Sequence, residues 1–439
     1  MCYHPSVPDV LLIEQLVADA LERAWPEATH RRIRLPALPG KADAVIGPRR
    51  AGKTWLLYAH AAALQAGPNP VAREQILYLN FEDERLAGLV ADDLHLFVDA
   101  WHRRHPAVLN HERYLLLDEI QTVPGWERFV RRLLDEQGNR LVVTGSSARL
   151  LSREIATALR GRALTTEVLP FSFAEALTHA GMAIPDRWPA PRTVAPVLRH
   201  ALDRYLQTGG FPEVQTLDGD LRARVLRDYV DVALLRDVIE RHGVTNIPAL
   251  RSLSRRLLAA PAGKFSVHRV HNDLRSSGLP VSKDSLHEWL GYLEDACFVF
   301  FVPIYTQSEA VRRANPRKAY PVDPALTPGT GDIGHRLETV VYIELRRRGY
   351  ELAYLQNADG TDVDFIATDW DANHVLVQVS ADIRDPATRV REVGALATAM
   401  RERDIREGMI LTLNGAETLE VPEGEIHIRA AWEWLASGG

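Results

Sequence analysis

Short apolar runs alternate with helical stretches between residues 44 and 169. Apolar positions that recur with a helical period predict helices, one of which begins at Thr54 and ends before Gly67 and Pro68. A further amphipathic helix is predicted over residues 10–23. Strands and helices that alternate in this way are typical of a mostly parallel sheet with crossover helices. The β-branched and leucine-rich runs predict five strands, at residues 44–46, 76–81, 114–117, 141–144 and 164–169.

The pattern changes after Pro170, where a proline-rich loop over residues 185–196 follows. Residues 197–242 predict helices that are interrupted by a turn at Gly209-Gly210-Phe211-Pro212. Residues 245–325 predict three helices and a β element, an order that suggests a winged helix-turn-helix. The remaining residues predict one helix and three strands, at 331–348, 351–355, 363–368 and 375–379.

The composition is that of an ordinary folded protein. Hydrophobic residues make up 46% of the chain and charged residues 25%, which excludes a long disordered or collagen-like protein. The formal net charge is −6, so a polyanion would have to meet a local basic patch. Only two cysteines occur, Cys2 and Cys297, which favours a reducing compartment. No run approaches the roughly 18 apolar residues of a membrane helix. We therefore expect a cytoplasmic multidomain protein that contacts no membrane.

A glycine-rich loop lies between the first predicted strand and the helix that follows it. It reads Gly47-Pro48-Arg49-Arg50-Ala51-Gly52-Lys53-Thr54. Glycines let backbone N–H groups turn inward around phosphate oxygens, and a helix N-terminus adds partial positive charge. We expect the loop to bind ATP, with Lys53 at the β and γ phosphates and the Thr54 hydroxyl on Mg²⁺. A chance glycine loop is the alternative that this pattern alone leaves open.

Two acids end the apolar run that begins at Tyr114. A buried strand would carry Asp118 to the C-terminal edge of the sheet, where open α/β sheets bind their ligands. We expect Asp118 to orient Mg²⁺ and Glu119 to polarise the attacking water. The strand at 76–81 fits between the loop and these acids, an insertion that separates ATPases with a catalytic glutamate from kinase-like and GTPase-like proteins. An ordinary strand end with solvated acids is the alternative.

Three more polar residues are candidates for the catalytic step. Ser146 follows the strand at 141–144, where it would hydrogen-bond the γ-phosphate or the lytic water, or cap a helix, or both. Arg160 and Arg162 precede the last predicted strand of the sheet. Either arginine would neutralise transition-state charge at a neighbouring subunit's ATP as an arginine finger. A surface salt bridge is the competing interpretation for both.

Together these motifs resemble those of a known family, the prokaryotic AAA-type ATPases that carry an uncharacterised C-terminal region. The resemblance covers nearly the whole chain and implies ATP binding, ATP hydrolysis and assembly into a homo-oligomeric ring. It also implies a helical lid, in which Arg236 or Arg241 would sense the γ-phosphate or form a plain ion pair. The segments that carry it are residues 46–54, 115–127, 144–147, 161–162 and 169–173, and downstream 209–213, 235–241, 292–295 and 315–318.

The C-terminal region resembles a restriction-endonuclease-like fold of the PD-(D/E)xK type. Glu338 would lie on its first helix and Asp364 on the strand that carries the metal-binding carboxylate. The strand that normally ends in E-x-K reads Gln378-Val379-Ser380. An amide thus replaces a carboxylate ligand, and a hydroxyl replaces the lysine that stabilises charge at the scissile phosphate. We expect a degenerate nuclease fold that serves binding or oligomerisation, with a metal-dependent nuclease as the alternative.

Residues 245–325 are the part of the chain in which we expect contacts with DNA. They contain 11 Lys and Arg residues against 7 Asp and Glu, an excess within an acidic chain. The presumed recognition helix offers Lys283, Ser285 and His287. The alternative is that the protein is a nucleotide-gated switch or scaffold that acts on a protein partner. Basic residues that would add phosphate contacts from a wing, or simply solvate a loop, are Arg312, Arg313, Arg317 and Lys318.

The expected fold class is α/β, with a P-loop parallel sheet followed by three further parts. Residues 1–200 are expected to form the ATPase core with its N-terminal helix, and residues 201–244 the helical lid. Residues 245–325 would form the winged helix-like domain, and residues 326–439 the degenerate restriction-endonuclease-like domain.

Overall fold

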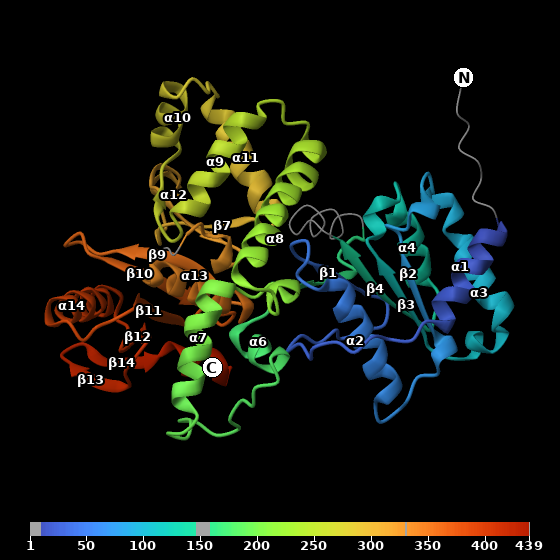
Figure 1. The fold of residues 1–439 in the computed structure, drawn as a ribbon, viewed down its shortest axis with the longest axis horizontal. Helices are drawn as coiled ribbons and strands as arrows, with labels where there is room; N and C mark the ends of the chain where they lie inside the picture. The colour runs from blue at the N-terminus through green and yellow to red at the C-terminus, as the bar shows by residue number, and fades with distance from the viewer. Residues whose placement is uncertain (1–9, 146–158, 330–331, 439) are drawn as a thin grey trace. The chain divides into compact units, whose positions relative to one another are not determined.

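A computed structural model describes residues 10–145, 159–329 and 332–438 of the protein. The chain divides into two compact units, Met1–Val168 and Leu169–Gly439, each of which is described by itself (Figure 1). The finer domain boundaries expected after residues 200, 244 and 325 stay predictions.

Within the described residues of the first unit, five parallel strands form a sheet in the order β2-β3-β4-β1-β5. The five strands predicted from the sequence are all present. β1 and β3 are buried along their whole length, which explains their continuous apolar runs. Because β4 pairs with both β1 and β3, the segments that follow these two strands lie on either side of its C-terminal end. The strands are β1 (Ala42–Ile46), β2 (Ile76–Asn80), β3 (Arg113–Asp118), β4 (Asn139–Gly145) and β5 (Ala163–Glu167).

Helices connect these strands and cover the sheet. α1 (Val10–Glu22) and α3 (His95–Arg104) pack together beside the edge strand β2 (Figure 1). α2 (Lys53–Ala66) follows β1 directly, and α4 (Trp126–Asp135) packs against β4. Leu57 and Ala61 of α2 are fully buried in the same core cluster as Leu116 of β3. Single-turn helices occur at Arg73–Gln75, Glu84–Leu86, Ala91–Asp93, Pro106–Asn110 and Ile120–Thr122.

The second unit begins with helices around the predicted glycine turn. The backbone N–H of Gly210 donates to the buried carboxylate of Asp323 at 2.6 Å. A Cβ on Gly209 would lie 1.8 Å from the same carboxylate, so this close approach requires glycine. In the segment predicted to be the lid, Arg236 forms an ion pair with Glu240 at 3.0 Å. The elements are α6 (Phe173–His179), α7 (Ala195–Thr208), α8 (Gly219–Val232), a π-helix (Ala233–Glu240) and a short turn at Pro212–Val214.

Between residues 245 and 325, all of them described, helices precede and follow a short strand and a small antiparallel sheet has the order β6-β8-β7. The three helices predicted here are present. Leu286 and Leu290 are buried, whereas Lys283 and His287 on the same helix are exposed. The elements are α9 (Ile247–Ala259), β6 (Lys264–Phe265), α10 (Val267–Ser276), α11 (Lys283–Asp295), β7 (Val299–Val302), α12 (Glu309–Ala314) and β8 (Arg317–Pro321).

A second α/β arrangement occupies residues 332 to 438, where the described strands form a sheet in the order β13-β14-β12-β11-β10-β9. β9, β10 and β11 pair antiparallel, and β11, β12 and β14 pair parallel. This sheet is consistent with the expected nuclease-like fold. Its elements are α13 (Ile333–Arg347), β9 (Glu351–Gln356), β10 (Asp362–Thr368), β11 (His374–Ser380), α14 (Pro386–Arg403), β12 (Glu407–Thr412), β13 (Glu417–Val421), β14 (Gly424–Ala430) and α15 (Ala431–Ser437), with a turn at Pro324–Leu326 before α13.

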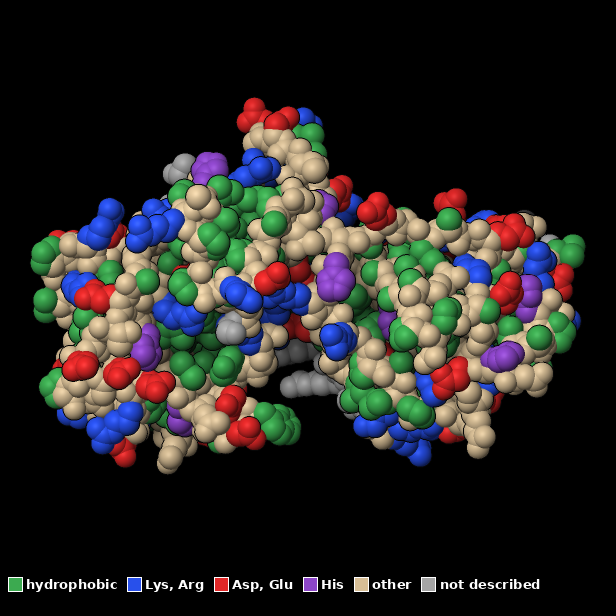
Figure 2. All heavy atoms as spheres, turned by 90° about the horizontal axis from the view of Figure 1, so that it is seen from below, with side chains coloured by type: hydrophobic (Ala, Val, Ile, Leu, Met, Phe, Trp, Pro, Cys, Tyr) green, Lys and Arg blue, Asp and Glu red, His purple; other side chains and the backbone are tan. Residues whose placement is uncertain are grey.

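The surface carries charges of both signs. Basic and acidic side chains are interspersed over the face drawn in Figure 2, in keeping with the small net charge of −6. In the part of the chain that is described, we find no helix whose length and apolar content would let it span a membrane.

Candidate nucleotide-binding site

The glycine loop between β1 and α2 has a backbone that few residues other than glycine adopt. Gly47 has a φ of +149°, and a Cβ built on it would lie 2.1 Å from the carbonyl oxygen of Val168. Gly52 has a φ of +94° and turns the chain into the first residue of α2. The loop therefore depends on both glycines, and it leads directly into a helix N-terminus, the end of a helix that attracts phosphate.

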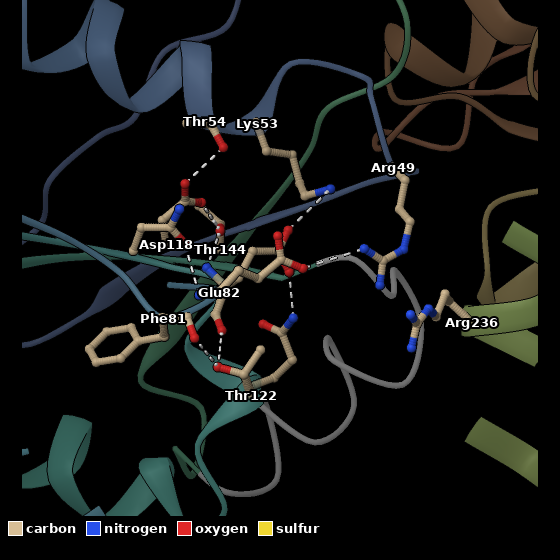
Figure 3. A network of polar contacts seen from close by, with 12 residues as sticks. Arg49, Lys53, Thr54, Phe81, Glu82, Asp118, Thr122, Thr144 and Arg236 are labelled. Carbon is tan, nitrogen blue, oxygen red and sulfur yellow. Dashed lines mark hydrogen bonds and ion pairs between the residues drawn. The ribbon is translucent and has the colours of Figure 1, made fainter. Parts of the chain in front are cut away.

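Lys53 is buried inside this loop. Its ammonium donates to the carbonyl oxygens of Gly47 and Pro48, at 3.1 Å each. The same nitrogen lies 3.8 Å from Oε1 of Glu119 (Figure 3). The loop thus holds one positive charge, that of Lys53, next to the carboxylate of Glu119, which follows β3.

Asp118 is the centre of a hydrogen-bond network at the end of β3 (Figure 3). Hydroxyl groups of three described residues donate to its carboxylate: Thr54 at 2.7 Å, Tyr78 at 2.9 Å and Thr144 at 2.5 Å. Burial raises the pKa of Asp118, and the hydrogen bonds from these hydroxyls oppose that shift. The network joins α2, β2 and β4 to the end of β3. It brings the hydroxyl of Thr54 and the carboxylate of Asp118 together, two hard oxygen donors of the kind that suit Mg²⁺.

Glu119 follows β3 in a left-handed conformation, with a φ of +53°. Its backbone N–H donates to the hydroxyl of Thr144 at 2.9 Å, and its carboxylate accepts from the amide of Gln121 at 2.5 Å. The hydroxyl of Thr122 secures the turn by donating to the carbonyl of Glu119 at 3.0 Å. Non-glycine residues rarely hold such a backbone, and such strain clusters at functional sites. Here it turns Glu119 out of the strand direction and toward Lys53.

The residues predicted for catalysis by a neighbouring subunit lie elsewhere. Arg162 precedes β5 and so lies at the N-terminal edge of the sheet, away from the glycine loop of its own chain. Its guanidinium donates to the carboxylate of Asp135 at 2.6 Å and to two backbone carbonyls. Arg160 is exposed and has a φ of +50°. Ser146 lies outside the described residues.

Tyr78, Gln121 and Thr122 are members of the network that were not predicted. Tyr78 looks like one more apolar residue of a buried strand, and only the pairing of β2 with β3 shows that its hydroxyl lies beside Asp118. Gln121 lies two residues after Glu119, and the amide in that position is the only sequence signal for its role. Arg49 and Glu82 form an ion pair of 3.4 Å at the rim of the site.

The predicted nuclease residues come together in the second unit. Glu338 on α13 and Asp364 on β10 both contact Lys318 of β8, and Gln378 of β11 contacts Asp364. Lys318 is only 6% exposed, so the expectation that it contacts phosphate from a wing is wrong. The ammonium of Lys318 is buried because it bonds the carboxylates of Glu338 and Asp364. The run Asn315-Pro316-Arg317-Lys318 nevertheless looks like a basic surface turn.

Comparisons with known proteins agree with this arrangement. Residues 40–177 match the family model of an AAA domain, residues 199–330 a domain of unknown function, and residues 333–418 a restriction endonuclease domain. The chain is 31% identical to the uncharacterized protein MJ1544 of Methanocaldococcus jannaschii over 438 residues, which covers 97% of this chain and 95% of that one. The protein belongs to this family of AAA-type ATPases with a restriction-endonuclease-like C-terminal domain.

Further similarities are less extensive. An uncharacterized protein of Haemophilus influenzae is 31% identical to this AAA-type protein over 346 residues, or 77% of this chain and 82% of that one. Among solved structures, the Walker-type ATPase PABY2304 of Pyrococcus abyssi matches with a TM-score of 0.37 and 14% sequence identity. The match covers 74% of this chain and 98% of that one.

Proposed function

We propose that this protein binds ATP with Mg²⁺ at the glycine loop and hydrolyses it. The observation that carries the proposal is the hydrogen-bond network that links Thr54, Asp118, Thr144 and Glu119. It connects the first turn of α2 to the strand end that bears two acids. The match of residues 40–177 to an AAA domain supports nucleotide binding and hydrolysis as the general activity.

Each residue of the site has a role in this proposal. Backbone N–H groups of residues 47–54, except Pro48, which has none, and the ammonium of Lys53 bind the β and γ phosphates. Thr54 and Asp118 hold Mg²⁺, which neutralises phosphate charge when it is bound. Glu119 orients the attacking water and accepts its proton. The amide of Gln121 and the ammonium of Lys53 keep the Glu119 carboxylate in place.

We also propose that the protein forms a homo-oligomer in which a neighbouring subunit completes the site. Arg160 is the better candidate for the arginine finger because it is exposed, whereas Arg162 is already bound to Asp135 and to backbone carbonyls of its own unit. Ser146 stays a candidate contact for the γ-phosphate or the lytic water. A cytoplasmic location is part of the same proposal.

Rates of phosphate release from ATP test the central step. Lys53→Ala removes the ammonium in the loop, and Lys41→Ala removes an exposed lysine just before β1 in the same unit. We expect the wild type and the Lys41 variant to hydrolyse ATP at the same rate, and the Lys53 variant to lose nearly all activity. Equal rates in all three proteins would reject the proposal.

A specific observation favours nucleic acid as the partner that the ATPase cycle serves. In the described part of the second unit, an open groove of about 940 Å³ lies between α8, α9 and residues 325–329. Its charged lining residues are Arg222, Arg227, Asp231, Arg251, Arg255 and Arg336.

These arginines differ in how they are held. Arg251 pairs with Asp231, and Arg336 is buried with its guanidinium on backbone carbonyls. Arg227 and Arg255 are exposed in the groove. A basic groove in a chain of net charge −6 is the local patch that a polyanion needs. We propose DNA binding through this groove and through a winged helix formed by residues 245–325.

Binding of duplex DNA over a salt series tests this second candidate. The double variant Arg227→Glu/Arg255→Glu reverses the exposed charges of the groove, and Arg192→Glu/Arg199→Glu reverses two exposed arginines outside it. We expect the groove variant to lose affinity and to show a salt slope smaller by about 2, because two phosphate contacts are lost. Equal affinities of the two variants would point to a protein partner.

A further inference from the structure

A buried lysine lies between the two carboxylates of the nuclease-like domain. The ammonium of Lys318 on β8 donates to Oε1 of Glu338 at 2.9 Å and to Oδ1 of Asp364 at 2.7 Å. The side chains of all three residues are at most 11% exposed. A cation of the chain itself therefore occupies the position between the two acids that the resemblance to nucleases singles out.

Other protein donors bind these two acids as well. The hydroxyl of Tyr320, two residues from Lys318 on β8, donates to Oε1 of Glu338 at 2.8 Å. The backbone N–H of Val379 donates to Oδ2 of Asp364 at 2.9 Å. Both carboxylates are thus bound by protein donors, and the strand β8 supplies two of those donors.

Gln378, which replaces a metal-binding carboxylate, has a structural role as well. Its Oε1 accepts from the backbone N–H of Asp364 at 3.1 Å, and its Nε2 donates to Oε2 of Glu392 at 2.7 Å. The amide therefore uses both of its ends inside the protein. A carboxylate at this position would lose the bond to Glu392 and place two like charges side by side.

These residues do not fit a divalent cation. Mg²⁺ and Mn²⁺ sites present several oxygen ligands and keep room for water and for the scissile phosphate. Here the space between the acids holds an ammonium, and the acids are shielded from solvent. Among the residues that the structure describes, no cluster of three or more His, Cys, Asp or Glu side chains is arranged to hold a metal.

We propose that the ammonium of Lys318 takes the place of a divalent cation in the nuclease-like domain, which therefore binds no metal between these acids. The resulting buried ion triad stabilises the packing of this domain against the small β6-β8-β7 sheet. The triad is formed by Lys318, Glu338 and Asp364. This inference concerns the second unit alone and does not depend on ATP binding.

The charges of the triad are consistent with this role. Burial by itself would lower the pKa of Lys318, but the two carboxylates outweigh burial and raise it, so the ammonium stays charged. Burial, and next the charge of Asp364, raises the pKa of Glu338 to about 7. The excess negative charge of two acids around one ammonium is thereby reduced near neutral pH.

Binding of Mn²⁺ to the full chain without nucleotide is the first test. It compares the wild type with Asp364→Asn by calorimetry, and both proteins are also assayed for cleavage of duplex DNA with Mn²⁺. We expect the same Mn²⁺ binding by both proteins and no cleavage that depends on Asp364. Mn²⁺ binding or DNA cleavage that the wild type shows and Asp364→Asn loses would overturn the proposal.

Thermal unfolding of lysine variants is the second test. Lys264 provides a matched control, because it bonds Asp362 at 2.8 Å and so joins β6 to β10 as a half-exposed pair, two residues before Asp364. We expect Lys318→Met to lower the unfolding midpoint by roughly 5 to 10 °C, since it leaves buried acids without a counter-ion. For Lys264→Met we expect a drop of no more than about 2 °C.

A triple variant separates the triad from ordinary packing of Lys318. Lys318→Met combined with Glu338→Gln and Asp364→Asn leaves no buried charge in the triad. We expect it to recover at least half of the midpoint lost in Lys318→Met alone. A Lys318→Met midpoint no lower than that of Lys264→Met, or a triple variant no more stable than Lys318→Met, would overturn the proposal.

Discussion

Replacing Glu119 with Gln should stop ATP hydrolysis while leaving ATP bound. The turn that positions this residue is held by a backbone N–H on Thr144 and by the Thr122 hydroxyl on a backbone carbonyl, so it does not need the carboxylate. The variant keeps this turn but loses the group that accepts a proton from water, together with the negative charge that lies 3.8 Å from the Lys53 ammonium. General base catalysis contributes about 10²- to 10⁴-fold in rate, or about 3 to 5 kcal/mol of barrier. ATP affinity should stay equal or increase slightly, because a negative charge near the phosphates is removed.

The assay is steady-state phosphate release at saturating ATP, with ATP affinity measured separately on the same preparations. Glu112→Gln serves as the control, since it makes the same change at an exposed glutamate just before the other end of β3, where Glu112 pairs with Arg140. We expect less than a twofold change in the control. A Glu119 variant that keeps more than about a tenth of the wild-type rate would refute the role of this residue as general base.

Three other changes test the site and the fold. Gly47→Ala should reduce ATP affinity at least about tenfold, because its Cβ meets the Val168 carbonyl at 2.1 Å. Gly88 also has a positive φ, of +88°, but open space around it, so Gly88→Ala should cost only about 1 to 2 kcal/mol of stability. Equal ATP affinities of the two variants by calorimetry would contradict this. Thr144→Val removes the hydrogen bonds of this hydroxyl with Asp118 and with the backbone N–H of Glu119. It should lower the unfolding free energy by about 1 to 3 kcal/mol in denaturant titrations, and it should also lower the rate of ATP hydrolysis. An unchanged rate would show that hydrolysis does not need these hydrogen bonds. Burial raises the pKa of Asp323 from 3.8 to about 6. Its contribution to the unfolding free energy is therefore present below pH 4 and falls by about 3 kcal/mol as the pH rises to 6. Asp323→Asn should make the unfolding free energy depend less on pH over this range, and an unchanged pH dependence would contradict the raised pKa of Asp323.

Most of the nucleotide site could be predicted because its residues fall into two short motifs, residues 47–54 and Asp118-Glu119. The glycine loop, Asp118 and Glu119 each follow an apolar strand, and parallel strands bring their C-terminal ends to one edge of a sheet. Tyr78 could not be predicted in the same way. Its side chain resembles a core residue, and its hydroxyl contacts Asp118 only through the pairing of β2 with β3.

The second unit was predicted in outline only. The helix and the first three strands after residue 331 have clear periods, but the elements from α14 to α15 were not anticipated, since their burial is set by packing within the sheet. The buried position of Lys318 is not evident from the sequence, because its neighbours are basic and turn-forming, while its partners Glu338 and Asp364 lie 20 and 46 residues away. Long-range ion pairs of this kind leave no periodic signal in a sequence.

Calorimetric titration of the full chain with ATP, with and without Mg²⁺, tests the central claim most directly. We predict that the wild type binds ATP and that the binding requires Mg²⁺. We also predict that Lys53→Ala, which removes the ammonium held by the Gly47 and Pro48 carbonyls, loses the binding. No Mg²⁺-dependent binding by the wild type, or equal binding by both proteins, would contradict nucleotide binding at this loop.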